Sequence, residues 1–343
     1  MKTPMTFTLL CILLASLAPR AEASYVLFGF DFGNVIEQYI FCDLLPSTFG
    51  FWQFGCTRIH DAPVAGMTIV ESSRSFDQTY DELINMLNGI APISIIAEVD
   101  HQANAESAGL SLDPTRVVLF GNPALGTPIM QENLMAGLDL PQKMLVWMEG
   151  PDGTVFVGYN EPSYHVARYG ENLEQLEQLT TISGALRNIA AAAAGVEADS
   201  IVPTAPLSPF SDDGVFVTES DNDFQTTWDN LLATIEASPA GIAATLDHAA
   251  NAETVGLDLS GAQSRLVVFG NPNVGTPFMQ SEQTAGIDLP LKILVTEDPS
   301  SGDVSVTTNQ LEFLQDRHGF SEVDVTMART AVMNFVTSAT TAN

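Results

Sequence analysis

The feature that most constrains this chain is an internal repeat. Residues 116–146 align without a gap on residues 265–295, with 19 identities in 31 positions. The match continues upstream, where the Asp-His dipeptide at 100–101 recurs at 247–248. Each copy is long enough to bury a core of its own, and two copies are too few for a solenoid. The chain is therefore expected to fold as two copies of one domain.

Five segments are expected along the chain. An apolar stretch from Met5 to Leu17, followed by the small-x-small pattern of Ala21 and Ala23, is typical of an export signal. We therefore expect a secreted or periplasmic protein. Three prolines between 203 and 209 indicate a linker between the copies. The segments are a signal peptide at 1–23, an aromatic-rich lead segment at 24–65, the first copy at 66–196, the linker at 197–213 and the second copy at 214–340.

The lead segment belongs to neither copy. It holds ten aromatic side chains, which we expect to pack on the first copy because so many are rarely left exposed. It also contains Cys42 and Cys56, the two cysteines that follow the signal. An exported compartment allows them to form a disulfide, which we expect; the alternative is two buried free thiols.

Composition excludes several classes of partner. The formal net charge is −30 over 343 residues, and a surface that negative repels phosphate backbones and anionic lipid headgroups. We therefore expect neither nucleic acid nor a membrane among the partners. With 45% hydrophobic residues the chain can supply two cores, which argues against intrinsic disorder.

The residue pattern predicts an α+β fold for each copy. In the second copy four apolar residues recur at helical spacing, namely Phe224, Trp228, Leu231 and Ile235. Thr276 is expected to cap another helix, with Pro277 at its first position. Strands are expected at 215–219, 242–246, 265–269, 289–297 and 304–308, and the last helices at 311–317 and about 322–338. The first copy is expected to end in a helix at about 171–194. Strands alternating with helices, plus one hairpin, predict a mixed β-sheet with helices packed on it.

The repeated motifs resemble those of a known family. FGNP-x-x-GTP-x-MQ and G-[LI]-D-L-P-x-K, with the Asp-His dipeptide before them, are similar to the domain of unknown function 302, over roughly residues 66–170 and 214–319. The resemblance implies a compact α+β fold that tends to pair into dimers, and it brings no agreed activity, cofactor or catalytic residue. Two copies on one chain can supply such a pair by themselves. We therefore expect intramolecular pairing of the copies and a monomer in solution.

Positive charges are scarce and fall at repeated positions. Lys143 and Lys292 are the two lysines that follow the signal, and they occupy the same place in the repeat. Asp139 and Asp288 precede them closely, so one interpretation is internal ion pairing, because an unpaired buried charge costs several kcal/mol. The other interpretation is an anion-binding site. Two arginine pairs also repeat, Arg116 with Arg265 and Arg168 with Arg317.

The Asp-His dipeptides contain the histidines that both copies retain. A histidine beside a carboxylate can act as a general base or a metal ligand. The alternative is that the aspartate caps the following helix and the histidine makes a hydrogen bond nearby. One histidine per copy is too few for zinc, which takes three or four ligands, and the chain has no C-x-x-C-H motif for covalent haem. We therefore expect neither metal nor cofactor.

The main functional prediction is an exported module that binds a small-molecule or anionic ligand and does not catalyse a reaction. The Gly-Thr-Pro turns add backbone N–H groups at a helix start, where anions can bind. The candidate binding residues are Asp100, His101, Asn122, Thr127, Lys143, Asp247, His248, Asn271, Thr276 and Lys292. The alternatives are an acid–base enzyme that uses the Asp-His pair, and a structural or partner-binding protein with no ligand site.

These candidates are also expected to cluster within each copy. If the strands that end at Asp100 and before Asn122 run parallel and adjacent, their ends share one edge of the sheet, where α/β proteins bind ligands. Lys143 reaches that edge only if its own strand runs antiparallel to both. On this arrangement His101 lies close to Lys143, and the equivalent pair of the second copy is close as well.

Overall fold

The structure is a computed structural model of the chain, and it describes residues 26–27, 30–31, 64–150, 153–204, 210 and 213–342. It divides into two compact units, residues 1–59 and 60–343. In the first unit β1 (Val26–Leu27) pairs antiparallel with β2 (Phe30–Asp31). The expected signal peptide, most of the lead segment and the Cys42–Cys56 disulfide lie outside the described residues. The second unit contains both copies.

The first copy forms a five-stranded sheet with strand order β3-β7-β6-β5-β4. Its elements are β3 (Met67–Glu71), α3 (Phe76–Gly89), β4 (Ser94–Asp100), α4 (His101–Ser107), β5 (Thr115–Gly121), α5 (Pro123–Glu132), η1 (Leu134–Leu138), β6 (Gln142–Glu149), β7 (Thr154–Asn160), α6 (Pro162–Tyr169), η2 (Glu171–Gln175) and α7 (Glu177–Ala194). A short turn of helix, η3 (Ala198–Ser200), follows at the start of the expected linker.

The second copy repeats this order, with its strands arranged β8-β12-β11-β10-β9. Its elements are β8 (Val215–Glu219), α8 (Phe224–Glu236), β9 (Gly241–Asp247), α9 (His248–Glu253), β10 (Gln263–Gly270), α10 (Pro272–Ser281), η4 (Gln283–Ile287), β11 (Leu291–Glu297), β12 (Val304–Asn309), α11 (Leu311–His318) and α12 (Thr326–Thr340). The predicted α+β class is confirmed.

Strand direction differs from the sequence-based expectation. A mixed sheet was predicted, but every pairing in the two five-stranded sheets is antiparallel. The reason is that α4 and α5, like their counterparts, return the chain to the neighbouring strand in the opposite direction. A parallel pair would instead require a crossover that carries the chain back along the sheet.

The long helices begin where the sequence provides caps. Ser75 and Gln78 form a reciprocal capping box at the start of α3. At the start of α8 the Asp223 carboxylate accepts a hydrogen bond from the backbone N–H of Thr226 at 2.8 Å. The buried apolar face of α8 includes the four residues expected from spacing, and α3 buries Phe76, Tyr80, Leu83 and Leu87 at the equivalent places.

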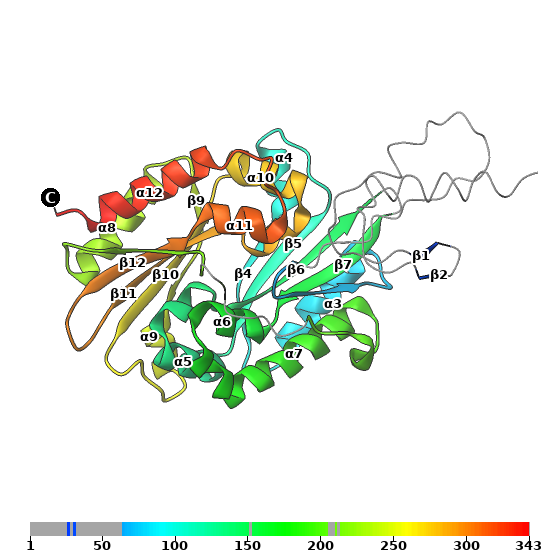
Figure 1. Ribbon diagram of the computed structural model, residues 1–343, viewed down its shortest axis with the longest axis horizontal. Coiled ribbons are helices and arrows are strands. Elements are labelled where there is room, and N and C mark those ends of the chain that lie inside the picture. The colour runs from blue at the N-terminus through cyan, green and yellow to red at the C-terminus, as the bar shows by residue number, and fades with distance from the viewer. Residues whose placement is uncertain are drawn as a thin grey trace, which may run out of the picture. The chain divides into compact units, whose positions relative to one another are not determined.

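The two sheets pack on each other, and helices cover their outer faces (Figure 1). Along β6 the side chains alternate: Leu145 and Trp147 pack between the sheets, whereas Met144 and Val146 pack under the helices of the first copy. The inner core joins Leu145 with Leu294 of the second copy and with other residues of both sheets. The second unit is therefore a four-layer arrangement of helices, sheet, sheet and helices.

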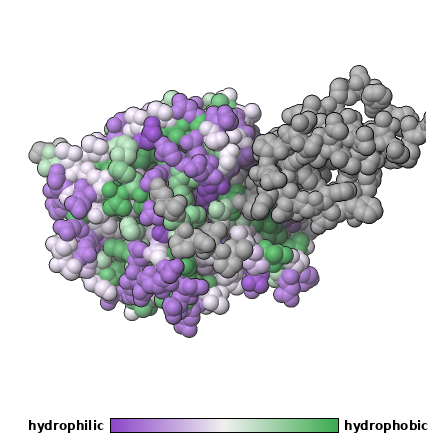
Figure 2. Space-filling model, viewed as in Figure 1, coloured by the Kyte–Doolittle hydropathy of each residue, from purple (hydrophilic) through white to green (hydrophobic). Residues whose placement is uncertain are grey.

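Reciprocal contacts relate the copies by a pseudo-two-fold axis. The Gln131 side chain of α5 donates to the Asp258 carbonyl, and Gln280 of α10 donates to the Ser111 carbonyl, each at 2.7 Å. A contact that recurs with its partners exchanged is the mark of an isologous interface. The copies thus pair within the chain, and the outer surface in Figure 2 carries interspersed hydrophilic and hydrophobic residues.

Candidate functional site

Asp100 and Asp247 cap helices. The Asp100 carboxylate accepts a hydrogen bond from the backbone N–H of Ala103 at 2.8 Å, and its other oxygen lies 2.7 Å from Arg116 Nε. Asp247 makes the same two contacts: it accepts from the backbone N–H of Ala250 and lies next to Arg265 Nε, each at 2.9 Å. Each carboxylate therefore bonds both to a backbone N–H at the start of a helix and to an arginine on a neighbouring strand. The capping interpretation of the Asp-His motif is confirmed for the aspartate.

His101 and His248 connect the two copies. The Nε2–H of His101 donates to the Gly286 carbonyl of the second copy at 3.3 Å, and that of His248 donates to the Gly137 carbonyl of the first at 3.2 Å. Burial lowers the pKa of each histidine to about 4, so both rings are neutral near pH 7. Among the described residues neither ring bonds to the aspartate beside it. The dipeptide therefore does not form an acid–base pair.

The glycines that accept these bonds have little space for a side chain. A Cβ on Gly137 would lie 3.3 Å from Leu294 Cδ1 of the second copy, and a Cβ on Gly286 would lie 2.9 Å from Leu145 Cδ1 of the first copy. The glycine in the repeated A-G-[LI]-D-L-P motif thus lets the backbone of one copy approach the other closely.

The two lysines form ion pairs with the opposite copy. Lys143 Nζ lies 3.3 Å from Asp288 Oδ1, and Lys292 Nζ lies 2.6 Å from Asp139 Oδ1. Each lysine is at most 5% exposed. Internal ion pairing was one of the two predicted interpretations, but the partner is the aspartate of the other copy and not the one nearby in sequence.

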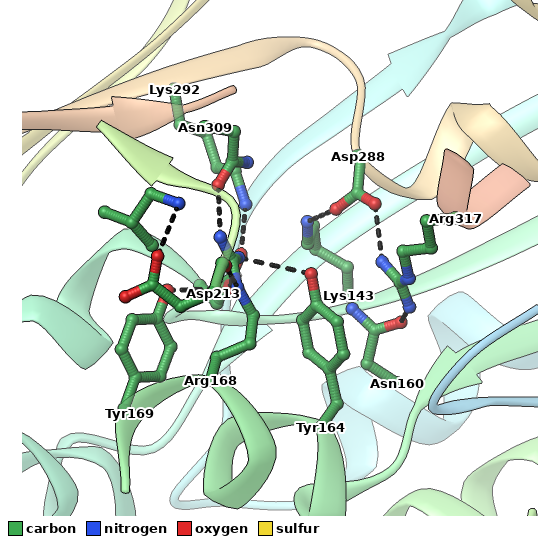
Figure 3. A network of polar contacts seen from close by, with 12 residues as sticks. Lys143, Asn160, Tyr164, Arg168, Tyr169, Asp213, Asp288, Lys292, Asn309 and Arg317 are labelled. Atoms are coloured by element: carbon green, nitrogen blue, oxygen red, sulfur yellow. Dashed lines mark hydrogen bonds and ion pairs between the residues drawn. The ribbon is translucent and has the colours of Figure 1, made fainter. Parts of the chain in front are cut away.

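Arginines and asparagines extend this network (Figure 3). Arg168 Nη1 lies 2.5 Å from Asp139, and its Nη2 donates to Asn309 of the second copy at 3.0 Å. Arg317 repeats this pattern. Its Nη1 lies 2.5 Å from Asp288 of its own copy, and its Nη2 donates to Asn160 of the first copy at 2.6 Å. The repeated Asn160 and Asn309 were not among the predicted site residues, although their recurrence in both copies is a signal that could have identified them.

The two aspartates differ in one contact. Tyr169 donates its hydroxyl to Asp139 at 2.8 Å, whereas His318 Nε2 lies 2.9 Å from Asp288 at the equivalent place. Burial alone would raise the pKa of both carboxyls, but the cations around them hold each pKa well below its usual range. Burial also lowers the pKa of His318, so that its other nitrogen accepts from the Thr284 hydroxyl at 3.1 Å.

Asn122 and Asn271 are the caps of α5 and α10. Each side chain accepts from the backbone N–H two residues later at 3.0 Å. Thr127 and Thr276 lie inside these helices, 4% and 1% exposed. Their prediction as helix starts is wrong, because the Asn-Pro pair five residues earlier already provides a cap and a first-turn proline.

A cleft of about 340 Å³ lies at the contact between the copies. From the first copy it is lined by Val99, His101 and Asn104. The second copy supplies residues of the FGNP, GTP and LDLP motifs and a stretch of β9. These lining residues are Gly241, Ile242, Ala243, Gly270, Asn271, Pro272, Val274, Gly275, Thr276, Phe278, Met279, Leu289, Pro290 and Leu291. The cleft therefore brings together His101, Asn271 and Thr276 of the predicted site residues, across the two copies.

Of the two residues predicted to cluster within the first copy, His101 lines this cleft and Lys143 does not. The cause is strand direction: β4 and β5 are antiparallel, so Asp100 pairs with Arg116 at the start of β5 while Asn122 follows the other end. Lys143 pairs with Leu119, on the side of β5 nearer Asn122. Both residues instead meet the segment 286–288 of the second copy.

No group of three or more His, Cys, Asp or Glu side chains in the described part of the chain is arranged to hold a metal ion. Among the same residues, no helix combines the length and apolar character needed to cross a membrane.

Comparison with known proteins identifies the repeated domain. The family model "Domain of unknown function DUF302" matches residues 68–193 and 216–337. A crystal structure of an uncharacterized conserved protein DUF302 from Bacillus stearothermophilus is 20% identical, with a TM-score of 0.32, and the match covers 38% of this chain and 98% of that one.

Curated relatives of the chain carry a functional name. "Fluoride-specific ion channel FluC 1" of Brucella suis biovar 1 (strain 1330) is 33% identical over 130 residues, which are 37% of this chain and 50% of that protein. "Fluoride-specific ion channel FluC 1" of Brucella abortus biovar 1 (strain 9-941) is also 33% identical over 130 residues, covering 47% of its length. The chain thus spans about half the length of the curated relatives it matches.

Proposed function

The chain belongs to the DUF302 family, and we propose that its paired copies form a binding module for a small neutral organic molecule, held in the cleft between them. The observation that carries this proposal is the convergence of repeated motifs on that cleft: the Asp-His motif comes from one copy, and the FGNP, GTP and LDLP motifs come from the other.

The size and lining of the cleft fit such a ligand. At about 340 Å³ it falls at the lower end of the range of small-molecule pockets, about 300–1,000 Å³. Its walls are mostly apolar, and His101, Asn104, Asn271 and Thr276 add a few polar groups, which is the usual composition of a small-molecule site.

The charge of the ligand follows from what surrounds it. Among the residues that the structure describes, the lining contains no lysine, arginine, aspartate or glutamate. The chain as a whole carries a formal charge of −30. A carboxylate or phosphate would find no compensating cation there. The anionic ligand considered from the sequence is therefore replaced, at this cleft, by a neutral one.

A ligand screen with matched variants tests the proposal. Neutral small molecules that raise the melting temperature of the mature chain should do so less in Asn104→Ala, because this exposed side chain lines the cleft. Asn251→Ala, at the equivalent position of the second copy, is the control and should respond like the wild type. Ala243→Trp, which fills the cleft, should abolish the response. Ligands that stabilise Ala243→Trp and wild type equally would favour the alternative of a structural protein with no site here.

The acid–base enzyme is the weaker alternative. The histidine ring of each pair gives its Nε2 hydrogen bond to a glycine carbonyl of the other copy, and each aspartate is already bonded to an arginine. Transport is not part of the proposal either, since the chain spans only about half the length of the relatives named as channels.

We also propose that the protein is exported and monomeric. The support is the apolar N-terminal stretch with its small-x-small pattern and the pairing of the copies within one chain. Mass spectrometry of exported protein should find Ser24 at its N-terminus and Cys42 bridged to Cys56. Light scattering at micromolar concentration should give the mass of one chain. A stable dimer, an uncleaved N-terminus or two free thiols would each contradict the corresponding part.

A further inference from the structure

One hydroxyl in the cleft between the copies has no hydrogen-bond partner among the described residues. Thr276 is 1% exposed and lies inside α10, in the repeated GTP motif. A threonine within a helix either faces solvent or donates its hydroxyl to the carbonyl four residues earlier. In this chain Thr181 donates to Glu177 at 3.1 Å, and Thr234 donates to Asn230 at 2.7 Å. In the described part of the chain the Thr276 hydroxyl makes no such bond, and burial keeps it from bulk water.

The other polar side chains of the cleft are engaged or exposed. His101 donates its Nε2–H to the Gly286 carbonyl, and the Asn271 side-chain oxygen accepts a backbone N–H of its own helix at 3.0 Å. Asn104 is exposed. Thr276 is therefore the polar residue of the described lining that is fully buried and whose hydroxyl is free to bond to a ligand.

The surroundings of this hydroxyl fit an uncharged polar group. A hydroxyl can both donate and accept hydrogen bonds. Apolar side chains such as Phe278 and Leu289 share the cleft with it, and they offer a charged group no compensation for lost water. A wholly apolar ligand would fill the cleft but leave the Thr276 hydroxyl buried without a partner, which is unfavourable. A neutral ligand with one group that bonds to Thr276 avoids this penalty.

We propose that the ligand of this cleft is a neutral molecule with an apolar body and one uncharged hydrogen-bonding group, an alcohol being the simplest case, and that this group bonds to the Thr276 hydroxyl. Such recognition depends on the ligand site proposed above, and it specifies the chemistry of the ligand and the residue that selects it. A neutral hydrogen bond changes an equilibrium constant roughly 3- to 10-fold. Thr276 should therefore set the selectivity of the cleft between polar and apolar ligands of the same shape.

The first copy offers a matched control position. Thr127 occupies the equivalent place in α5, is 4% exposed, and likewise makes no hydrogen bond among the described residues. It is not part of the lining of this cleft. Thr127→Val and Thr276→Val therefore remove the same hydroxyl from the same helical position at similar burial. They differ in whether the change reaches the cleft.

The test compares two probes of nearly equal shape on the full mature chain. Benzyl alcohol and ethylbenzene differ by a hydroxyl in place of a methyl group, and ligand-observed NMR titration gives the affinity of each. The ratio of the affinity for benzyl alcohol to that for ethylbenzene should fall roughly 3- to 10-fold in Thr276→Val. The ratio should stay at the wild-type value in Thr127→Val. Thr276→Ser keeps the hydroxyl and should also retain the wild-type ratio.

Ala243→Trp, which fills the cleft, separates this proposal from the proposed site. If Ala243→Trp abolishes binding of both probes but the ratio in Thr276→Val equals that of the wild type, the site stands and the role of Thr276 is overturned. An equal fall in Thr127→Val would show an effect of the helix and would also overturn it. If neither probe binds the wild type, or if both bind Ala243→Trp as tightly as the wild type, the proposed site fails, and the role of Thr276 fails with it.

Discussion

The Asp139 and Asp288 carboxylates occupy equivalent positions in the two copies but have different surroundings. Asp139 lies 2.6 Å from Lys292 and accepts a hydrogen bond from the Tyr169 hydroxyl. Asp288 lies 3.3 Å from Lys143 and contacts the His318 ring. The side with the longer ion pair also has the lysine whose pKa is lowered to about 7. The comparison teaches that the copies share a scaffold while one half of the network is held more tightly than the other.

Replacing each aspartate by asparagine should give the largest loss of stability and should show most clearly whether the two halves of the network differ. Asp139→Asn leaves Lys292 and Arg168 without their carboxylate, which should lower the free energy of unfolding by about 3–5 kcal/mol. Asp288→Asn should cost less, because Lys143 can give up its proton near neutral pH. Urea unfolding at pH 7.5 measures both, and a larger loss for Asp288→Asn would show that the two halves were ranked wrongly.

The lysines should differ in their pH dependence. Lys143 has a lower pKa in the folded than in the unfolded state, so above pH 7 the unfolded chain binds more protons. The free energy of unfolding should therefore rise by roughly 2–3 kcal/mol between pH 7 and 9 from this group. Lys143→Met should lose that rise, and Lys292→Met should diminish it, because after burial the charge of Lys292 is the largest cause of the lowered pKa of Lys143. Parallel curves for wild type and Lys143→Met would rule out this assignment.

The two interface histidines should behave alike. Both have a pKa of about 4 in the folded state, so the unfolded chain takes up protons first as the pH falls below 6.5. Each should reduce the free energy of unfolding by roughly 2 kcal/mol between pH 6.5 and 5. His101→Gln and His248→Gln should flatten this acid slope by similar amounts. A clear difference between them would show that the pseudo-symmetry does not extend to the histidines.

The smallest expected effect is at the helix caps. Asp100→Ala and Asp247→Ala should each lower the free energy of unfolding by about 1 kcal/mol, since the partly exposed arginine contacts add little. Thermal unfolding should give equal shifts for the two variants. A loss of several kcal/mol in either one would indicate a role beyond capping.

Local patterns predicted much of the fold. The spacing of Phe224 and Trp228 predicted α8. Asp100 and Asp247 were expected to cap short helices, as observed. The start of α10 was misplaced because Asn-Pro and Thr-Pro are both suitable beginnings, and only the position of the helix on the sheet distinguishes them.

The site was harder to predict, because its contacts join residues far apart in sequence. Lys143 follows Asp139 closely, yet a side chain on β6 that alternates with Met144 points between the sheets, where the other copy lies. The alternation of β6 was visible in the sequence, but the register between the copies was not. For this reason the repeated residues could be named, and their partners could not.

A double-mutant cycle tests this exchange of partners most directly. Lys292→Met combined with Asp139→Asn should show a coupling energy of roughly 1–3 kcal/mol, because these side chains meet across the copies. Lys292→Met combined with Asp288→Asn, the aspartate nearer in sequence, should show a clearly smaller coupling. A larger coupling of Lys292 with Asp288 than with Asp139 would contradict the account.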